Sequence, residues 1–307
     1  MCLITALAGG VGAARFLTGL IEFVDQEDLV VVVNTGDDVE FFGLHVSPDV
    51  DIVTYTLAGL VNDETGWGVR GDTFECLGML KRFGEVDWFN LGDRDFATSI
   101  LRTKLLRAGF SLSQISAKVS HDLGLRVKIL PMTDDRFSTF VQTPFGVVSF
   151  EEYLVKWAAQ DVVLGVNFVG MDAARPAVGV VESILASERV ILCPSNPIVS
   201  IGSILSVAGI RESLRRSGAR KVAVSPIVAG APVKGPADKL LRGLGVEVSA
   251  FGVAQLYADF LDVYIIDSMD AAEKGRIEQL GVKVVVVDTL MKNLAVKTAL
   301  AKAALEA

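Results

Sequence analysis

The chain has 307 residues, of which 51% are hydrophobic and 21% charged, and its formal net charge is -8 at pH 7. This composition supports a large apolar core and excludes a disordered chain. The acidic balance leaves no basic stripe for phosphate backbones, so we expect no nucleic-acid partner.

Strand-like and helical segments alternate along the chain. This pattern predicts an α/β, Rossmann-like fold with a mostly parallel, doubly wound sheet, and runs such as "LVVVV" are typical of strands buried on both faces. The expected strands include residues 1–7, 29–34, 189–193, 262–267 and 282–288. The expected helices are 13–23, 51–61, 72–83, 94–108, 111–123 and 290–305.

One stretch departs from this alternation. Two alternating runs around Pro144 to Gly146 indicate an antiparallel hairpin over 138–150. We therefore expect a single domain over 1–307, with a small inserted subdomain of hairpin and helices over about 135–180.

Two features bear on the surroundings of the protein. No apolar run approaches the roughly 18 residues of a membrane span, so we expect no membrane partner. Cys2, Cys76 and Cys193 are scattered without metal-ligand spacing, which favours a reduced, cytoplasmic protein.

The expected first strand is followed by the glycine-rich turn "AGGVGAARF". Gly9, Gly10 and Gly12 would let backbone amides approach a ligand, and a helix N-terminus favours an anion such as a phosphate. The turn matches neither GxGxxG nor a Walker A loop, so classical NAD binding and P-loop ATP hydrolysis are disfavoured.

The segment "VVVNTGDDVEFFGLHVSPDVD" (31–51) carries five acids, with no Lys or Arg between Arg15 and Arg70 to pair with them. Asp37 and Asp49 could simply cap helices. Clustered carboxylates repel unless they are solvated or bridged, however, and Mg²⁺ commonly bridges one or two carboxylates to substrate phosphates.

Within this segment, Asp49 and Asp51 flank one residue, so in an extended chain their side chains point the same way. We therefore expect them to be the main metal-ligand pair, with Asp37 beside them. Asp51 also stands at the start of the expected helix 51–61, where the alternative role is that of an N-cap.

Three further loops follow expected strands. "NLGDRDFA" carries Arg94, a forked donor suited to phosphate, although Arg94 could instead pair with the neighbouring Asp93. Two rigid loops rich in Pro, "CPSNPIVSIGS" and "VSPIVAGAPVKGPADK", carry candidate ligand-binding residues. These are Ser195, Asn196, Ser200 and Lys234.

Eight motifs occur in order: "GGVGAARFL", "VVVNTGDD", "SPDVDIVTYTLAG", "LGDRDFAT", "LPMTDD", "PSNPIVSIG", "SPIVAGAPVKGPA" and "DTLM". On these motifs the chain resembles, over essentially its whole length, the 2-phospho-L-lactate transferases of coenzyme F420 biosynthesis, the CofD/FbiA family. The resemblance implies transfer of 2-phospho-L-lactate, or phosphoenolpyruvate in the bacterial form, from a guanosine diphosphate-linked donor. The acceptor is the ribityl hydroxyl of the deazaflavin Fo, and the products are F420-0 or its dehydro form plus GMP.

The resemblance also implies roles for the residues singled out above. Asp51 and Asn90 match positions associated with Fo, and Asp49, Asp51 and Arg94 become the catalytic candidates. The glycine turn, the "PSNP" loop and Lys234 would hold the guanine nucleotide, with Mg²⁺ as the cofactor and a homodimer as the assembly. Asp51 as general base is disfavoured, because a bound cation lowers the pKa of a carboxylate.

Two other interpretations remain. CofD-like regulatory proteins share this fold and glycine turn and bind nucleotide sugars without transfer chemistry, but the "PSNP" loop and the "SPDVD" acids favour the transferase. An NAD(P) dehydrogenase lacks its glycine fingerprint here.

Overall fold

The structure, a computed structural model, describes residues 3–307, so Met1 of the expected first strand and Cys2 lie outside the described residues. Its centre is a seven-stranded sheet in the order β14-β13-β10-β9-β1-β2-β5, and every neighbouring pair is parallel. The strands are β1 (Ile4–Ala8), β2 (Leu29–Val33), β5 (Lys128–Pro131), β9 (Arg189–Leu192), β10 (Arg220–Val224), β13 (Val263–Asp267) and β14 (Lys283–Val287). The predicted α/β class and parallel sheet are confirmed.

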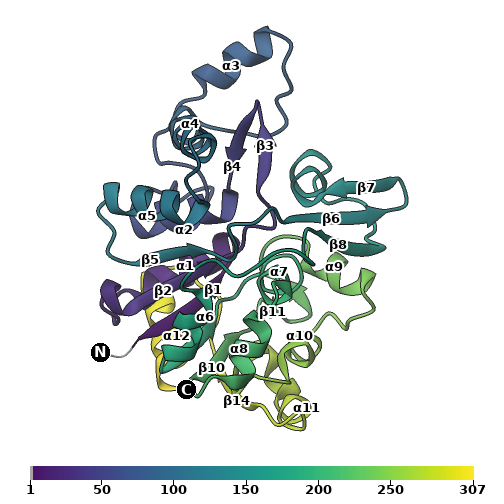
Figure 1. Cartoon of the computed structure of the whole chain (residues 1–307). Helices are drawn as coiled ribbons and strands as arrows, with labels where there is room; N and C mark the ends of the chain where they lie inside the picture. The colour runs from purple at the N-terminus through teal and green to yellow at the C-terminus, as the bar shows by residue number, and fades with distance from the viewer. Residues whose placement is uncertain (1–2) are drawn as a thin grey trace.

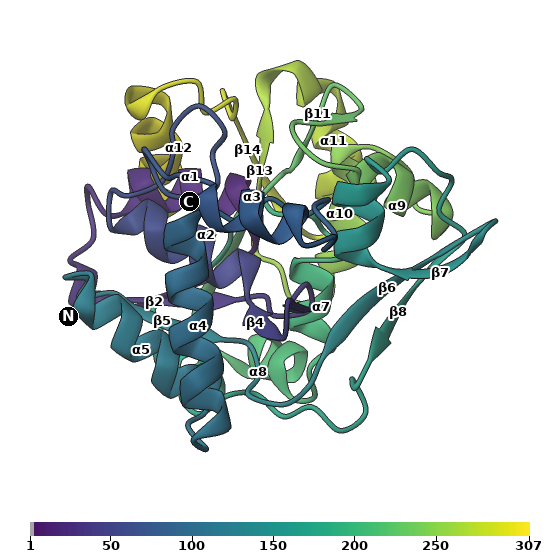
Figure 2. The same ribbon diagram turned by 90° about the horizontal axis from the view of Figure 1, so that it is seen from above.

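Helices cover both faces of this sheet (Figures 1 and 2). One face packs against α1 (Gly10–Leu20), α2 (Pro48–Leu57) and α12 (Leu294–Glu306), and the other against α6 (Val180–Ala186), α7 (Ile201–Ser206), α8 (Ile210–Arg216), α10 (Ala250–Tyr257) and α11 (Lys274–Glu278). Two apolar cores result, one on each face, because β2 and its neighbours bury their side chains in both directions.

Further elements rise from the loops of this sheet. Figure 1 shows one group built around an antiparallel pair, and it contains β3 (Val39–Phe41), β4 (Leu44–Val46), α3 (Glu75–Arg82), α4 (Asp93–Arg107) and α5 (Leu112–Asp122). A second group is a three-stranded antiparallel sheet of β6 (Ser138–Thr143), β7 (Gly146–Ser149) and β8 (Gly165–Val169). The remaining short elements are β11 (Ile227–Val228), β12 (Ala231–Pro232) and α9 (Ala237–Gly243).

One helix boundary changes the interpretation of the acidic segment. Helix α2 begins at Pro48, three residues before the expected start at 51, and a proline is favoured in the first turn because its missing N–H costs nothing there. Asp49 and Asp51 therefore lie in the first helical turn and not in an extended segment. Their predicted common direction is wrong, because residues two apart on a helix point to different sides.

The strand order reverses between β1 and β9. From β1 the chain proceeds outward to β2, whereas from β9 it proceeds in the other direction to β10, β13 and β14. Ligands of doubly wound sheets bind beyond the carboxyl ends of strands at such a reversal. The glycine turn follows β1 and the "PSNP" loop follows β9, so both face this point. In residues 3–307, no helix combines the length and the apolar character needed to cross a membrane.

Candidate active site

A cavity of about 760 Å³ opens at the point where the strand order reverses. Loops after β1, β2 and β9, the first turns of α2, and the segments before α4 and α9 line it, and the segment after β7 closes one side. It brings together most of the candidates from the sequence, namely Gly9, Gly10, Gly12, Asp37, Asp49, Asp51, Asn90, Ser195, Asn196, Ser200 and Lys234.

The glycine turn is held tightly by its neighbours. The Gly9 amide donates to Ser195 Oγ at 3.1 Å, and the Gly10 amide donates to Asp49 Oδ1 at 2.8 Å. Gly10 has φ +71°, a conformation that favours glycine. A Cβ on Gly12 would lie 2.3 Å from the Pro194 carbonyl oxygen. The glycines thus allow the turn to approach the "PSNP" loop, and the amide of Gly10 binds a carboxylate of the protein itself.

Asp37 and Asp49 share one hydrogen-bond donor. Asn34, the residue after β2, donates from Nδ2 to Asp37 Oδ2 at 3.1 Å and to Asp49 Oδ2 at 2.9 Å. Both carboxyl groups are buried. Burial raises the pKa of Asp37 well above its ordinary value, with repulsion from Asp49 adding to the effect, and burial raises the pKa of Asp49 to about 6.

This pair suits a divalent cation. Asp37 Oδ1 is buried and makes no well-formed hydrogen bond within residues 3–307, and the nearby Thr139 hydroxyl only partly offsets the raised pKa of Asp37. An ion bound to this oxygen would remove the cost of burying it. No three His, Cys, Asp or Glu side chains of these residues converge as a metal-binding group, so the predicted trio with Asp51 is not assembled. Two carboxylates with substrate phosphates are, however, a common arrangement for Mg²⁺.

Asp51 has a partner that the sequence analysis missed. It forms a salt bridge with Arg102 of α4, whose side chain is only 3% exposed. Arg102 also donates to the carbonyl of His45 at 3.2 Å. Burial raises the pKa of Asp51 and the Arg102 guanidinium opposes that rise. The expectation that the acidic segment has no basic partner is therefore wrong, because the partner comes from a distant helix.

Two other candidates have local roles in this structure. Arg94 is not among the lining residues, and its Nη1 donates to the carbonyl of Arg70 at 3.0 Å. Asn196 does line the cavity, but its Oδ1 accepts from the amides of Ile198 and Val199 at 3.0 and 3.3 Å. Asn196 therefore shapes the "PSNP" loop, and only its Nδ2 remains to donate to a ligand.

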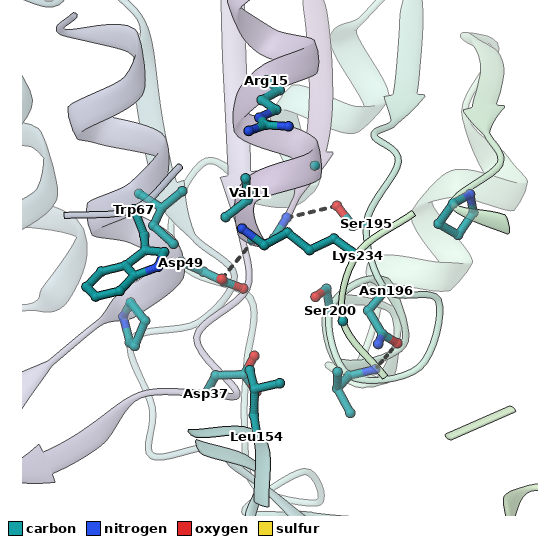
Figure 3. A pocket seen from close by; sticks show the side chains of 18 of the residues that line it. Val11, Arg15, Asp37, Asp49, Trp67, Leu154, Ser195, Asn196, Ser200 and Lys234 are labelled. Atoms are coloured by element: carbon teal, nitrogen blue, oxygen red, sulfur yellow. Dashed lines mark hydrogen bonds between the residues drawn. The ribbon is translucent and has the colours of Figure 1, made fainter. Parts of the chain in front are cut away.

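A positively charged wall lies by the glycine turn. Figure 3 shows Lys234 extending past Val11 toward Asp49, with Arg15 on the next turn of α1. Lys234 Nζ donates to the Thr65 carbonyl at 3.1 Å, and burial together with the nearby Arg15 guanidinium lowers the pKa of Lys234. Neither cation forms a salt bridge within the described part of the chain, so both are available to an anion.

Comparison with known proteins identifies the family of the chain. The family model described as 2-phospho-L-lactate transferase CofD matches residues 4–304. The chain belongs to this family. It is a transferase of the type that acts in coenzyme F420 biosynthesis, as the predicted resemblance implied.

Individual members of this family are similar to the chain over nearly its whole length. A phosphoenolpyruvate transferase of Streptomyces griseus is 43% identical, with 99% of this chain and 97% of the relative covered. A 2-phospho-L-lactate transferase of Methanosarcina acetivorans is 42% identical, with 94% and 93% covered. A solved structure of a UPF0052-family protein from Bacillus halodurans has a TM-score of 0.65 and 17% identity over 99% of this chain and 98% of that one, which supports the fold alone.

Several residues that line this cavity were not predicted from the sequence. The cavity walls include aromatic and apolar side chains that suit a flat ring, namely Tyr55, Trp67, Phe89, Leu91, Phe150 and Leu154. Polar residues missed were Arg15, Asp95, Glu151 and Lys292 in the cavity and Asn34 and Arg102 behind it. Of these missed residues, only Asn34 could have been found from the sequence, because it directly follows a buried strand and so lies at the edge of the sheet where ligands bind.

Proposed function

We propose that the protein transfers a three-carbon phospho-acid from a guanosine diphosphate-linked donor to the ribityl hydroxyl of Fo, with Mg²⁺ bound by Asp37 and Asp49. Family membership supports the reaction type. The supporting observation in this chain is one cavity lined both by the carboxylates Asp37 and Asp49 and by the cations Arg15 and Lys234, which form no salt bridge among residues 3–307.

The donor would lie between the glycine turn and the "PSNP" loop. Arg15 and Lys234 are placed to neutralise its diphosphate, because charge-assisted hydrogen bonds to phosphate are the strong ones. Ser195 is committed to the Gly9 amide, so Ser200 and Asn196 Nδ2 are the remaining polar groups of that loop.

A bound Mg²⁺ would supply neutralisation of the charge on the diphosphate, which is the main requirement of phosphoryl transfer. Asp37 Oδ1 offers it an unpaired ligand atom. Asn34 holds both carboxylates in place from behind.

The acceptor would lie across the cavity from the nucleotide. Asn90 and Leu91 precede α4, and Trp67, Phe89 and Phe150 provide apolar walls for the deazaflavin ring. Asp51, fixed by Arg102, offers its remaining oxygen as a hydrogen-bond acceptor for a ribityl hydroxyl.

Binding measurements separate this proposal from a nucleotide-sugar-binding regulatory protein. Fluorescence of Fo titrated with the protein should report saturable binding, and GDP should bind by calorimetry more tightly than a UDP-sugar. Binding of UDP-sugars with no binding of Fo would contradict the proposal. The proposal also includes a homodimer, which light scattering during size-exclusion chromatography tests.

A further inference from the structure

Five carboxyl side chains line the cavity, and four of them have a hydrogen-bond donor in the protein. Asn34 binds Asp37 and Asp49, Arg102 binds Asp51, and the Gly92 amide donates to Asp95 Oδ2 at 3.1 Å. The fifth is Glu151. Among residues 3–307, no donor lies within hydrogen-bond distance of its carboxylate, and it forms no salt bridge.

Glu151 nevertheless lies in a buried position, since only 7% of the residue is exposed. It follows β7 and begins a short helical segment, from which Phe150, Leu154 and Val155 also line the cavity. Figure 3 shows Leu154 of this segment at the same end of the cavity as Asp37. Its carboxylate oxygens open onto the cavity, because neither is among the fully buried unpartnered oxygens of residues 3–307. A carboxylate that no protein donor holds and that faces a ligand cavity is free to accept a hydrogen bond from the ligand.

The groups facing Glu151 limit what that partner can be. Repulsion from Asp49 of α2 and from Asp38 of the loop after β2 acts on Glu151, and Glu151 in turn acts on Asp37. Burial, with this repulsion, raises the pKa of Glu151 to about 8. A further negatively charged group is disfavoured beside it, whereas a neutral hydroxyl can donate its proton there.

We propose that Glu151 binds the attacking hydroxyl of the acceptor and takes its proton during the transfer, an inference that rests on the proposed function. The hydroxyl O–H bond breaks as its oxygen bonds to phosphorus. The P–O bond to GMP breaks, GMP leaves with the electron pair, and the proton passes to the Glu151 carboxylate. Asp37 and Asp49 are poorer bases when they hold a cation, and Asp51 is ion-paired.

The test compares Glu151→Gln with Glu152→Gln. Glu152 is the matched control, because it is the adjacent residue and pairs with Lys156 outside the cavity. For Glu151→Gln we expect kcat to fall by ~10²-fold or more, the scale of a lost general base. The dissociation constants of Fo and GDP should change less than about threefold, since the side chain keeps its size.

The pH profile gives a second readout. In the parent protein kcat should rise with pH as Glu151 ionises, and this rise should be absent in Glu151→Gln and present in Glu152→Gln. Glu151→Asp keeps the carboxylate and should retain more turnover than Glu151→Gln. Melting of the glutamine variant at pH 8 should be no lower than in the parent, because a buried charge is removed.

Three results would overturn the proposal. Glu151→Gln could keep most of the parental kcat, could keep the same pH profile, or could lose Fo affinity with kcat unchanged, which would make Glu151 a binding residue only. A parent protein that binds Fo and GDP but forms no product would contradict the proposed function and this inference together.

Discussion

Asp51 and Arg102 form a buried salt bridge that joins the first turn of α2 to the middle of α4. Asp51 lines the cavity and Arg102 lies behind it, where its guanidinium also donates to the His45 carbonyl. An N-cap role for Asp51, the alternative considered from the sequence, is excluded because Ser47 occupies the cap position. Asp51 should therefore contribute more to the free energy of unfolding than an N-cap residue would.

Asp51→Asn should therefore destabilise the protein. The substitution leaves the Arg102 charge buried without a counter-charge, and breaking such a pair costs about 3 kcal/mol. Chemical denaturation of both proteins measures the loss. Asp63→Asn is the matched control, because Asp63 pairs with Arg70 at the surface and its loss should cost less than ~1 kcal/mol. Equal midpoints for Asp51→Asn and the parent would argue against the buried pair.

Gly12→Ala should weaken GDP binding and lower stability. Its Cβ would lie 2.3 Å from the Pro194 carbonyl oxygen, so the glycine turn and the "PSNP" loop must separate, at a cost of ~1–3 kcal/mol. Gly78→Ala in α3 is the control, since nothing lies within 4 Å of its Cβ position and alanine favours a helix. Calorimetric titration with GDP, beside thermal melting, measures both effects. Unchanged GDP affinity in a folded Gly12→Ala protein would place the nucleotide elsewhere.

Lys234→Met should reduce GDP affinity by ~10-fold or more, since a charge-assisted hydrogen bond contributes about 1.5–3 kcal/mol. Fo affinity should fall less than GDP affinity, because Lys234 extends past Val11 at the glycine turn, where the nucleotide is proposed to lie. Lys302→Met, in an exposed pair with Glu306 on α12, controls for the lost charge. If Lys234→Met weakened Fo binding as much as GDP binding, the assignment of Lys234 to the nucleotide site would be wrong.

Asp37→Asn should raise the melting temperature of the metal-free protein. Burial and the carboxylates around it raise the pKa of Asp37, so its ionised form is destabilising near neutral pH, and asparagine removes that charge. In the parent, Mg²⁺ added with GDP should raise the melting temperature, because an ion that binds only the native state stabilises it. Asp37→Asn should largely lose that Mg²⁺ effect. If KCl at the same ionic strength raised the melting temperature of the parent protein as much as Mg²⁺ does, the effect would be charge screening and not binding of Mg²⁺.

The sheet was predictable from the sequence because its strands are continuous apolar runs and its loops carry Gly, Pro and Asp. The same logic located the glycine turn, the "PSNP" loop and Lys234 in one cavity, since strand ends share an edge. The directions of the side chains in the acidic segment were not predictable. Helix α2 begins at Pro48 and not at residue 51, so Asp49 and Asp51 lie in its first turn and contact different partners.

Residues that act through tertiary contacts were also missed. Arg102 is one of several arginines on an ordinary-looking helix, and its role depends on a salt bridge to a residue 51 positions away. Glu151 lies in a segment whose sequence shows only a strand end, and its burial in the cavity depends on how β6 and β7 pack. The Arg94 guanidinium was expected to bind phosphate, but its side chain does not line the cavity and donates to the carbonyl of Arg70.

Mass spectrometry of the product tests the central claim most directly. The parent protein is incubated with Fo, Mg²⁺ and either the guanosine diphosphate-linked lactate donor or its enolpyruvate counterpart. The account predicts a new deazaflavin carrying one phospho-acid, F420-0 or its dehydro form, together with an equal amount of GMP. GMP release without a modified deazaflavin, or unchanged Fo with both donors in a protein shown to bind Fo and GDP, would contradict it.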